Sequence, residues 1–377
     1  MGSLLSIFQY FDDITLKMLL MWLIGGVLIY LAIAKNMEPT LLLPMGFGTI
    51  LVNLPFSGAI NQIFAGMEVE GPVQLLFNAV IANELFPLLL FIGIGAMIDF
   101  EPLLANPKLL LFGGAAQFGI FITLVLASLC GFDLKDAASI AIIGAADGPT
   151  AIFVSGVLKS NYQSAIMVAA YSYMALVPVI QPPVIKLITT KKERSIKMAY
   201  TGKPVKKLTK ILFPIIVTIV AGVFAPQSVA LVGFLMFGNL IRACGVLDSL
   251  SNTAQNVLAN LITILLGISV SFQMRAEVFV KWETLLIIGL GLFAFVFDTV
   301  GGVMLGKLIN LFSKKKINPM IGAAGISAFP MSSRVVHKLG LEADPSNFLL
   351  MHTVGANVSG QIASVIAGGL ILNFFVG

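Results

Sequence analysis

The sequence predicts an all-α polytopic membrane protein with two structural repeats. Of its 377 residues, 58% are hydrophobic and only 11% are charged, against roughly 25% charged residues in a soluble domain. Its apolar runs follow one another almost continuously, which favours one membrane domain over several soluble ones. In addition, one run in each half of the chain is broken by glycine and proline. A bilayer tolerates broken backbone only where protein or a wet cavity surrounds it, so these two segments are where function is expected.

The apolar runs give the expected helices. The stretch 56–83 differs from them, because four glycine or proline residues stand beside Glu68 and Glu70, which predicts loop and interfacial helix. The run Ala165–Ile188 contains three prolines and is expected to be irregular. The other apolar runs are Leu16–Ala34, Leu41–Leu54, Leu85–Ile98, Leu109–Cys130, Ile211–Phe224, Val229–Ile241, Leu258–Val270, Leu285–Leu311 and Phe348–Val376.

The linker 186–210 carries nine Lys or Arg residues and one acid, Glu193. Such a short basic loop belongs on the cytoplasmic side, so we expect a multi-pass protein of the cell inner membrane. The charge could serve topology alone, or it could bind an acidic partner or anionic lipid headgroups. With Tyr200 as its one aromatic residue, the linker does not resemble a nucleic-acid-binding module.

The first broken segment is Gly144-Ala145-Ala146-Asp147-Gly148-Pro149-Thr150. It lies inside the apolar run 137–158, where Asp147 is the only acid. An ionisable group at that depth is costly and by default marks an ion pathway or a proton relay. The alternative is an acid that snorkels from a helix end or forms a structural pair. The adjacent break favours the first interpretation, because freed carbonyls beside a carboxylate give a hard cation the oxygen ligands that it needs.

A second broken segment, Asn318 to Pro330, lies in the other half of the chain. Gly95-Ala-Met-Ile-Asp-Phe100 resembles Gly267-Ile-Ser-Val-Ser-Phe272, and Gly144-Ala-Ala resembles Gly322-Ala-Ala, at nearly equal offsets. We therefore expect a first repeat over 1–190 with its insert at 56–83, a cytoplasmic linker over 191–210 and a second repeat over 211–377. If the broken segments dip in and return, the repeats are inverted; if they cross fully, the repeats are parallel. Corresponding broken segments in two halves favour inversion.

One carboxylate and several neutral oxygens are the chemistry available where the repeats would meet. This set suits a monovalent cation such as Na⁺, or a proton if the carboxylate titrates, because Mg²⁺ and Ca²⁺ usually recruit more carboxylates. The side-chain candidates are Asp147, Asn318, Ser327, Asn357 and Ser364, and the supporting backbone is at Gly148, Pro149, Gly322 and Gly325.

Asp298, Arg334 and Tyr173 are further candidates for a functional role, and each also has a structural interpretation. Asp298 is a rival buried acid that we interpret as a structural partner or secondary site. Arg334 ends the second broken segment and could bind a carboxylate through two hydrogen bonds or simply snorkel to the interface. Tyr173 could donate a proton or merely pack. His337 and His352 have no spacing typical of a metal site, and neither have the two cysteines.

Four motifs carry a family resemblance over nearly the whole chain. Gly144 to Thr150, Tyr171 to Pro183, Asn318 to Arg334 and Gly355 to Gly360 resemble, in this order, the membrane-embedded beta subunit of the biotin-dependent sodium-pumping decarboxylases. The resemblance implies a carboxybiotin decarboxylase that consumes a proton and drives Na⁺ outward. It also implies that Asp147 binds Na⁺ and takes part in proton exchange. The matching functional positions are Tyr173, Asn318, Gly322, Ser327 and Arg334, with Asn357 a further polar one.

The resemblance also implies cofactors and partners. The cofactors are Na⁺ and biotin, the biotin arriving as carboxybiotin on a carrier subunit. The other expected partners are a cytoplasmic carboxyltransferase subunit, a small membrane-anchored subunit, membrane lipid and further copies of this chain. The compact length is more similar to members that act with CoA esters than to the oxaloacetate ones. The alternative function is a Na⁺-coupled secondary transporter of an organic anion, with Arg334 on the substrate carboxylate.

Overall fold

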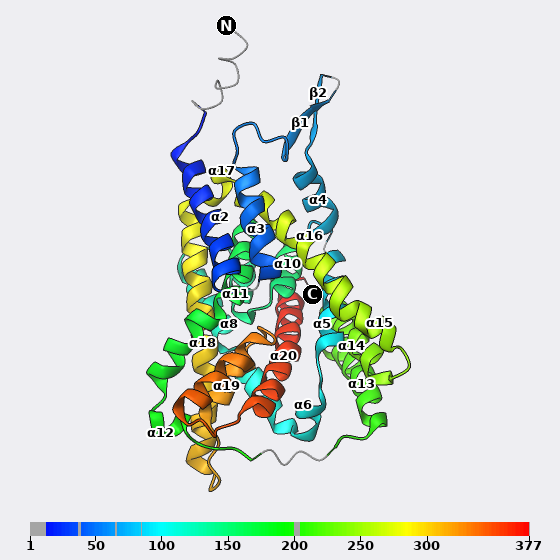
Figure 1. Ribbon diagram of the computed structural model, residues 1–377, viewed down its shortest axis with the longest axis vertical. Coiled ribbons are helices and arrows are strands. Elements are labelled where there is room, and N and C mark those ends of the chain that lie inside the picture. The colour runs from blue at the N-terminus through cyan, green and yellow to red at the C-terminus, as the bar shows by residue number, and fades with distance from the viewer. Residues whose placement is uncertain (1–12, 37–38, 65, 84, 200–203, 377) are drawn as a thin grey trace. The chain divides into compact units, whose positions relative to one another are not determined.

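The computed structural model describes residues 13–36, 39–64, 66–83, 85–199 and 204–376, and it is predominantly helical (Figure 1). Within these ranges, seven helices are long and apolar enough to cross a membrane, and two bent helix pairs raise that number to nine. The prediction of an all-α polytopic membrane protein is confirmed. The chain divides into two compact units, Met1–Pro87 with Asn260–Leu286 and Leu88–Ala259 with Ile287–Gly377. Each unit draws on both halves of the chain, while the two repeats and their inversion stay a prediction.

The first unit is built from α2 (Leu16–Ala34), α3 (Pro39–Val52), β1 (Asn61–Phe64), β2 (Met67–Glu70), α4 (Pro72–Val80), α16 (Ala259–Ser271), η6 (Phe272–Met274) and α17 (Ala276–Phe279). Helices α2 and α3 touch through their backbones, because a Cβ on Gly25 would lie 2.7 Å from the Gly46 carbonyl oxygen. The Asn53 amide holds the end of α3, donating to the Met274 carbonyl and accepting from the Ala276 N–H.

The insert 56–83 contains the short helix that its composition predicts, preceded by a β-hairpin that was not predicted. Strands β1 and β2 pair antiparallel, with Asn61 opposite Glu70. Helix α4 buries Val73, Phe77 and Val80. Because these three residues lie on one face of a helix, α4 is amphipathic and suits the interface better than a span.

The second unit contains α5 (Leu85–Met97), α6 (Glu101–Ala105), η2 (Pro107–Leu109), α7 (Leu110–Ala115), α8 (Phe118–Leu129), α9 (Leu134–Ala141), η3 (Ile142–Ala145), α10 (Gly148–Val157), α11 (Gln163–Ile188), α12 (Lys191–Arg194), α13 (Lys207–Phe224), η4 (Pro226–Ser228), α14 (Val229–Cys244), α15 (Asp248–Asn252), η5 (Thr253–Leu258), α18 (Trp282–Phe312), η7 (Pro319–Gly325), α19 (Met331–Ala343) and α20 (Leu350–Val376).

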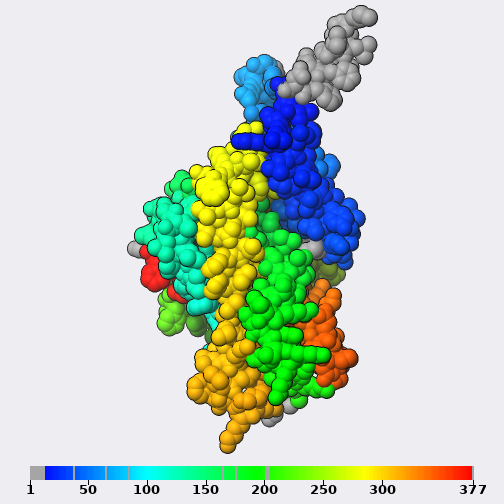
Figure 2. Space-filling model, turned by 90° about the vertical axis from the view of Figure 1, so that its left-hand side faces the viewer, coloured from blue at the N-terminus to red at the C-terminus, as the bar shows by residue number. Residues whose placement is uncertain are grey.

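Helix α20 is the centre of this unit. It packs against α7, α10, α19 and η7, and 67% of its spanning window is buried, the largest share among the seven candidate spans in the described ranges. Helices α11 and α18 run side by side on an outer face, in green and yellow (Figure 2). The buried polar residues of α20, among them Asn357, Gln361 and Ser364, therefore have protein rather than lipid as their neighbour.

Two spans are less regular than an apolar run requires. The expected helix 109–130 is divided into α7 and α8 at Ala116 and Gln117. Helix α11 bends by 69° between Ala165–Met174 and Leu176–Ile188, and its three prolines follow the bend. The irregularity expected of the run Ala165–Ile188 is confirmed. The division at Ala116 and Gln117 was not predicted, because neither residue at the break is a glycine or a proline.

The basic linker is fastened to the second unit over its first part. Helix α12 begins with a capping box, in which Thr190 and Glu193 bond each other's backbone. Glu193 also pairs with Lys307 at 3.2 Å. The carbonyl of Arg194 accepts hydrogen bonds from two side-chain amides, Asn318 at 2.8 Å and Asn347 at 2.9 Å. The linker thus lies against the ends of α18, η7 and α19.

Candidate functional site

Asp147 stands at the break in the first discontinuous segment. Ala146 ends η3 in the left-handed conformation, with φ +52°, and Asp147 is extended. Gly148 and Pro149 then open α10, where proline is tolerated because the first turn has no intrahelical partner for its missing N–H. The carboxylate consequently projects from a chain reversal that is buried, with Asp147 only 3% exposed.

Only neutral groups surround this carboxylate. The Thr150 hydroxyl donates to Asp147 Oδ2 at 2.6 Å, and the Ser364 hydroxyl of α20 also faces it. The Tyr171 ring packs against Gly148, where an added Cβ would lie 2.7 Å from the ring carbon Cδ1. Among the described residues no lysine, arginine or histidine forms an ion pair with Asp147. A buried carboxylate without a cationic neighbour is costly unless a cation or a proton joins it.

The second discontinuous segment meets the first directly. The Ser327 hydroxyl donates to the Ala145 carbonyl, two residues before Asp147. Two residues of α20 hold this segment in turn: Gln361 donates to the Ser327 carbonyl, and Asn357 donates to the Ile326 carbonyl at 2.7 Å and the Ser332 hydroxyl at 3.0 Å. The two breaks that the sequence singles out, 182 residues apart, therefore form one site.

One face of α20 lines this site. Asn357, Gln361 and Ser364 are spaced four and three residues apart, so they lie on the same side of the helix. Asn357 Oδ1 and Gln361 Oε1 are buried oxygens without a hydrogen-bond donor in the described part of the chain. Buried acceptors are normally satisfied, so unpaired oxygens on the helix face that brings Ser364 to the Asp147 carboxylate fit a hard cation.

The other predicted residues lie in different surroundings. Asn318 is buried and uses its side chain to cap η7, accepting from the Met320 N–H, and to hold the linker. Tyr173 donates its hydroxyl to the Ile288 carbonyl on α18. Arg334 is exposed in the first turn of α19. No hydrogen bond within the described ranges joins any of these three side chains to Asp147.

The glycines of the second segment serve close packing. A Cβ on Gly302 of α18 would lie 2.6 Å from the Gly322 carbonyl carbon. A Cβ on Gly325 would lie 2.5 Å from the Phe112 carbonyl oxygen of α7. Glycine is required at both positions because the helices approach η7 backbone to backbone. Accordingly, η7 is wedged between α7, α18 and α20.

Asp298, the rival acid, lies at the divided helix. Its Oδ1 accepts the Gly119 N–H at 2.5 Å, at the start of α8, where helix N–H groups lack intrahelical partners. A Cβ on Gly144 would lie 2.7 Å from Asp298 Oδ2, an oxygen with no donor within the described residues. This geometry fits the structural interpretation, since the carboxylate secures α8 beside the first broken segment.

Sequence reasoning did not single out Thr150, Tyr171 or Gln361 for this site. The Asp-x-x-Thr spacing was available as a signal, because a side chain three residues into a helix can reach the residue before its first turn. The spacing on α20 was a second signal. Tyr171 had none, because only packing distinguishes it from Tyr173.

Comparison with known proteins assigns the family. The model of the Na⁺-transporting oxaloacetate decarboxylase beta subunit matches residues 17–375. The chain is 48% identical to the methylmalonyl-CoA decarboxylase subunit beta of Propionigenium modestum, over 97% of this chain and 96% of that one. It is 49% identical to the glutaconyl-CoA decarboxylase subunit beta of Acidaminococcus fermentans, over 93% and 92%. It is 44% identical to the oxaloacetate decarboxylase beta chain of Klebsiella pneumoniae, over 94% of both.

The match covers both broken segments, the linker between them and α20. The chain belongs to the family of Na⁺-transporting decarboxylase beta subunits, the membrane subunits of sodium-pumping decarboxylases.

Proposed function

We propose that this chain decarboxylates carboxybiotin delivered on a carrier subunit and couples that step to Na⁺ export at Asp147. The observation that carries the proposal is the hydrogen bond from Ser327 to the Ala145 carbonyl. It joins the two broken segments around a buried carboxylate that has only neutral neighbours. A carboxylate site between two discontinuous segments can take up a cation from one side of the membrane, and movement of either segment would open the site.

Asp147 supplies the charge that holds Na⁺, and neutral oxygens complete its shell. Asn357 Oδ1 is free to accept the cation because the amide nitrogen makes both of that side chain's hydrogen bonds. Ser327 retains lone pairs while its proton is donated. Asn318 is a positioning residue and not a ligand, since its side-chain amide fixes the start of η7 to the linker. One carboxylate with neutral oxygens favours Na⁺ over a divalent ion.

Arg334 binds the carboxylate of carboxybiotin. The side chain is exposed, and no ion pair within the described residues occupies it. Helix α19 is held at the linker end of the unit through Lys186 and Glu342, 3.1 Å apart. A planar guanidinium recognises a carboxylate through two parallel hydrogen bonds.

The reaction releases CO₂ and leaves biotin with one added proton, so the site must deliver a proton to the departing ureido nitrogen. Asp147 is one carrier for that proton, because Na⁺ and a proton compete for the same oxygens. Tyr171 is better placed than Tyr173 to relay it. The Tyr171 hydroxyl is buried without an acceptor in the described ranges, whereas the Tyr173 hydroxyl donates to Ile288.

The partners are a biotin carrier subunit, a cytoplasmic carboxyltransferase, a small membrane-anchored subunit and further copies of this chain. Membership of the family supports these partners, because its relatives are named as subunits of decarboxylases. Identity is 48–49% to relatives named for CoA esters and 42–45% to those named for oxaloacetate. A CoA ester is therefore the favoured acyl donor of the complex.

The test is the decarboxylation of carboxybiotin by the purified complex of Arg334→Lys, which keeps the charge but loses the paired hydrogen bonds. The KM for carboxybiotin should rise at least ten-fold, about 1.4 kcal/mol, while the Na⁺ concentration for half-maximal rate stays unchanged. Lys338→Gln, one turn further along α19 and also exposed, is the matched control and should behave as wild type. An unchanged KM in Arg334→Lys, or a protein that purifies without a biotinylated subunit, would contradict the proposal.

A further inference from the structure

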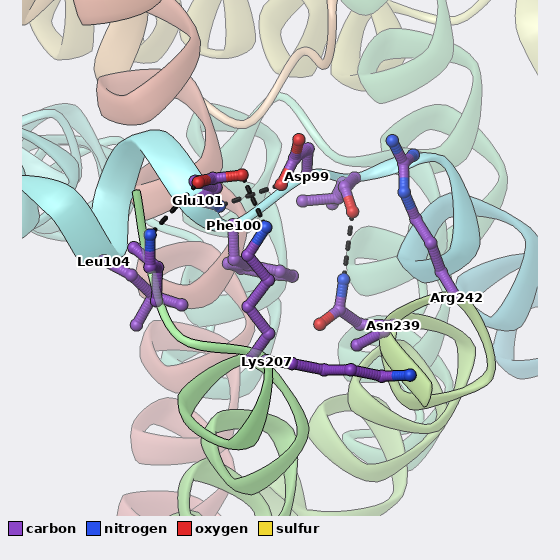
Figure 3. Close-up of a pocket in the computed structure, with 11 residues that line it drawn as sticks. Asp99, Phe100, Glu101, Leu104, Lys207, Asn239 and Arg242 are labelled. Atoms are coloured by element: carbon purple, nitrogen blue, oxygen red, sulfur yellow. Dashed lines mark hydrogen bonds and ion pairs between the residues drawn. The ribbon is translucent and has the colours of Figure 1, made fainter. Parts of the chain in front are cut away.

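A polar pocket of about 460 Å³ opens in the second unit, away from Asp147. It lies where the end of α5 and the start of α6 meet the first turn of α13 and the last turns of α14 (Figure 3). Val205, near the end of the basic linker, forms part of its edge. The positive-inside rule puts this end of the unit at the cytoplasmic face of the membrane.

The pocket has more positive than negative charge. Its lining includes Lys207, Lys210 and Arg242 against Asp99 and Glu101. Glu101 is already engaged: Lys210 lies 2.5 Å from its carboxylate and the Val205 N–H donates to it at 3.2 Å. The Lys210 hydrogen bond, with the backbone donor, lowers the pKa of Glu101, so this pair stays ionised and neutral overall.

Two cations are left for a ligand. The Arg242 guanidinium uses one nitrogen to donate to the carbonyls of Met97 and Ala96 at the end of α5, which leaves its other N–H groups. Lys207 enters no ion pair with a described residue. In Figure 3 its side chain extends beneath Asn239 toward the helix that carries Arg242. A phosphate with one negative charge would balance these two cations and Asp99.

An apolar groove lies deeper between the same two helices. It measures about 270 Å³, and Pro214 and Ile219 of α13 with Met236 and Phe237 of α14 line it. Pro214 is one turn below Lys210 along α13. Only 11% of the spanning window of α13 is buried, so the groove opens to the hydrocarbon of the bilayer.

We propose that the pocket and groove bind one anionic phospholipid of the cytoplasmic leaflet, with its phosphodiester on Lys207 and Arg242 and an acyl chain between α13 and α14. An amphiphile matches both features: a free phosphate would leave the groove unused, and an apolar helix would leave the excess positive charge of the pocket uncompensated. The cytoplasmic leaflet is also where anionic headgroups meet basic residues near the membrane surface.

The first variant to test is Lys207→Gln, with Lys206→Gln as its matched control. Lys206 is the neighbouring exposed lysine, and it does not line the pocket. The delipidated full-length protein in detergent is titrated with phosphatidylglycerol and followed by native mass spectrometry. One surface lysine contributes about 1 kcal/mol to anionic lipid binding, so the affinity should fall about five-fold in Lys207→Gln and remain at the wild-type value in Lys206→Gln.

A second variant tests the groove without touching the charges. A Cβ on Gly233 would lie 3.8 Å from Thr218, an ordinary contact, so Gly233→Leu should fold while filling the groove. It should weaken phosphatidylglycerol at least five-fold and leave Na⁺-dependent turnover at saturating lipid unchanged.

The other occupants give different results. If inorganic phosphate binds as tightly as phosphatidylglycerol, the lipid assignment is wrong and the ligand is a soluble anion. Equal affinity in wild type and Lys207→Gln, or phosphatidylcholine binding as well as phosphatidylglycerol, would refute the headgroup assignment. A hydrophobic subunit that remains bound after delipidation and is lost in Gly233→Leu would replace the acyl chain with a helix.

Discussion

The contact between Gly302 and Gly322 should determine the position of the second broken segment. These glycines bring the backbones of α18 and η7 together, and a Cβ on Gly302 would lie 2.6 Å from the Gly322 carbonyl carbon and 3.3 Å from the Ala323 nitrogen. Carbon atoms in contact settle at about 3.5–4.0 Å. Gly302→Ala must therefore separate α18 from η7 by roughly 1 Å, and a backbone atom cannot rotate away as a side chain can.

Overpacking of this kind typically costs about 1–3 kcal/mol. Because η7 leads directly to Ser327, the same shift should lengthen its hydrogen bond to the Ala145 carbonyl. We expect Gly302→Ala to lower the midpoint of thermal unfolding by several degrees and to raise the Na⁺ concentration for half-maximal turnover. Gly322→Ala should do the same. The double variant should cost less than the sum of the two, since the first methyl already opens the gap.

Thermal unfolding of the detergent-solubilised protein and Na⁺ titration of turnover are the two assays. Gly289→Ala is the control, because this glycine lies on the same helix and an added Cβ would have nothing within 4 Å. If Gly302→Ala and Gly289→Ala behave alike, the close approach of α18 and η7 is not what holds the segment.

Three further outcomes are expected. Asn357→Leu removes the donor to the Ile326 carbonyl; it should cost about 1–3 kcal/mol and raise the Na⁺ requirement, and an unchanged Na⁺ titration would remove Asn357 from the shell. Asp298→Asn weakens the bond from the Gly119 N–H; it should lower stability by roughly 1–3 kcal/mol yet keep Na⁺-dependent turnover, whereas loss of turnover in a stable protein would make it the primary acid. The lowered pKa of Glu101 stabilises the fold above the unfolded pKa of about 4.3 and is lost as pH falls through the folded value. The melting difference between wild type and Glu101→Gln should thus be full at pH 7, begin to shrink below about pH 4.3 and vanish only below the folded pKa, and a difference independent of pH would refute it.

The sequence was sufficient for the features that depend on chain chemistry. An acid followed by Gly148 and Pro149 in an apolar run predicts a buried break, and the structure has Asp147 there. The positive charge of the 186–210 segment predicts a linker, and the composition of the 56–83 insert predicts a loop with a short helix, although not its β-hairpin. Such features are legible because glycine, proline and charge act locally.

What the sequence could not supply depends on contacts between distant residues. Tyr171 and Tyr173 are two positions apart, so they point about 200° away from each other on a helix; only packing puts Tyr171 beside Gly148. The division at Gln117 is stabilised by Asp298, 179 residues from Gly119. From the sequence alone Asn318 is a possible cation ligand, but in the structure its amide nitrogen donates to backbone carbonyls of the linker.

The most direct test of the account is Na⁺-dependent decarboxylation of carboxybiotin by the purified complex, with wild type, Asp147→Asn and Asp298→Asn compared side by side. We predict that wild type requires Na⁺, that Asp147→Asn assembles but loses Na⁺-dependent turnover, and that Asp298→Asn retains it. Asp147→Asn that turns over at the wild-type rate with the same Na⁺ requirement would contradict the assignment of Asp147 as the coupling site.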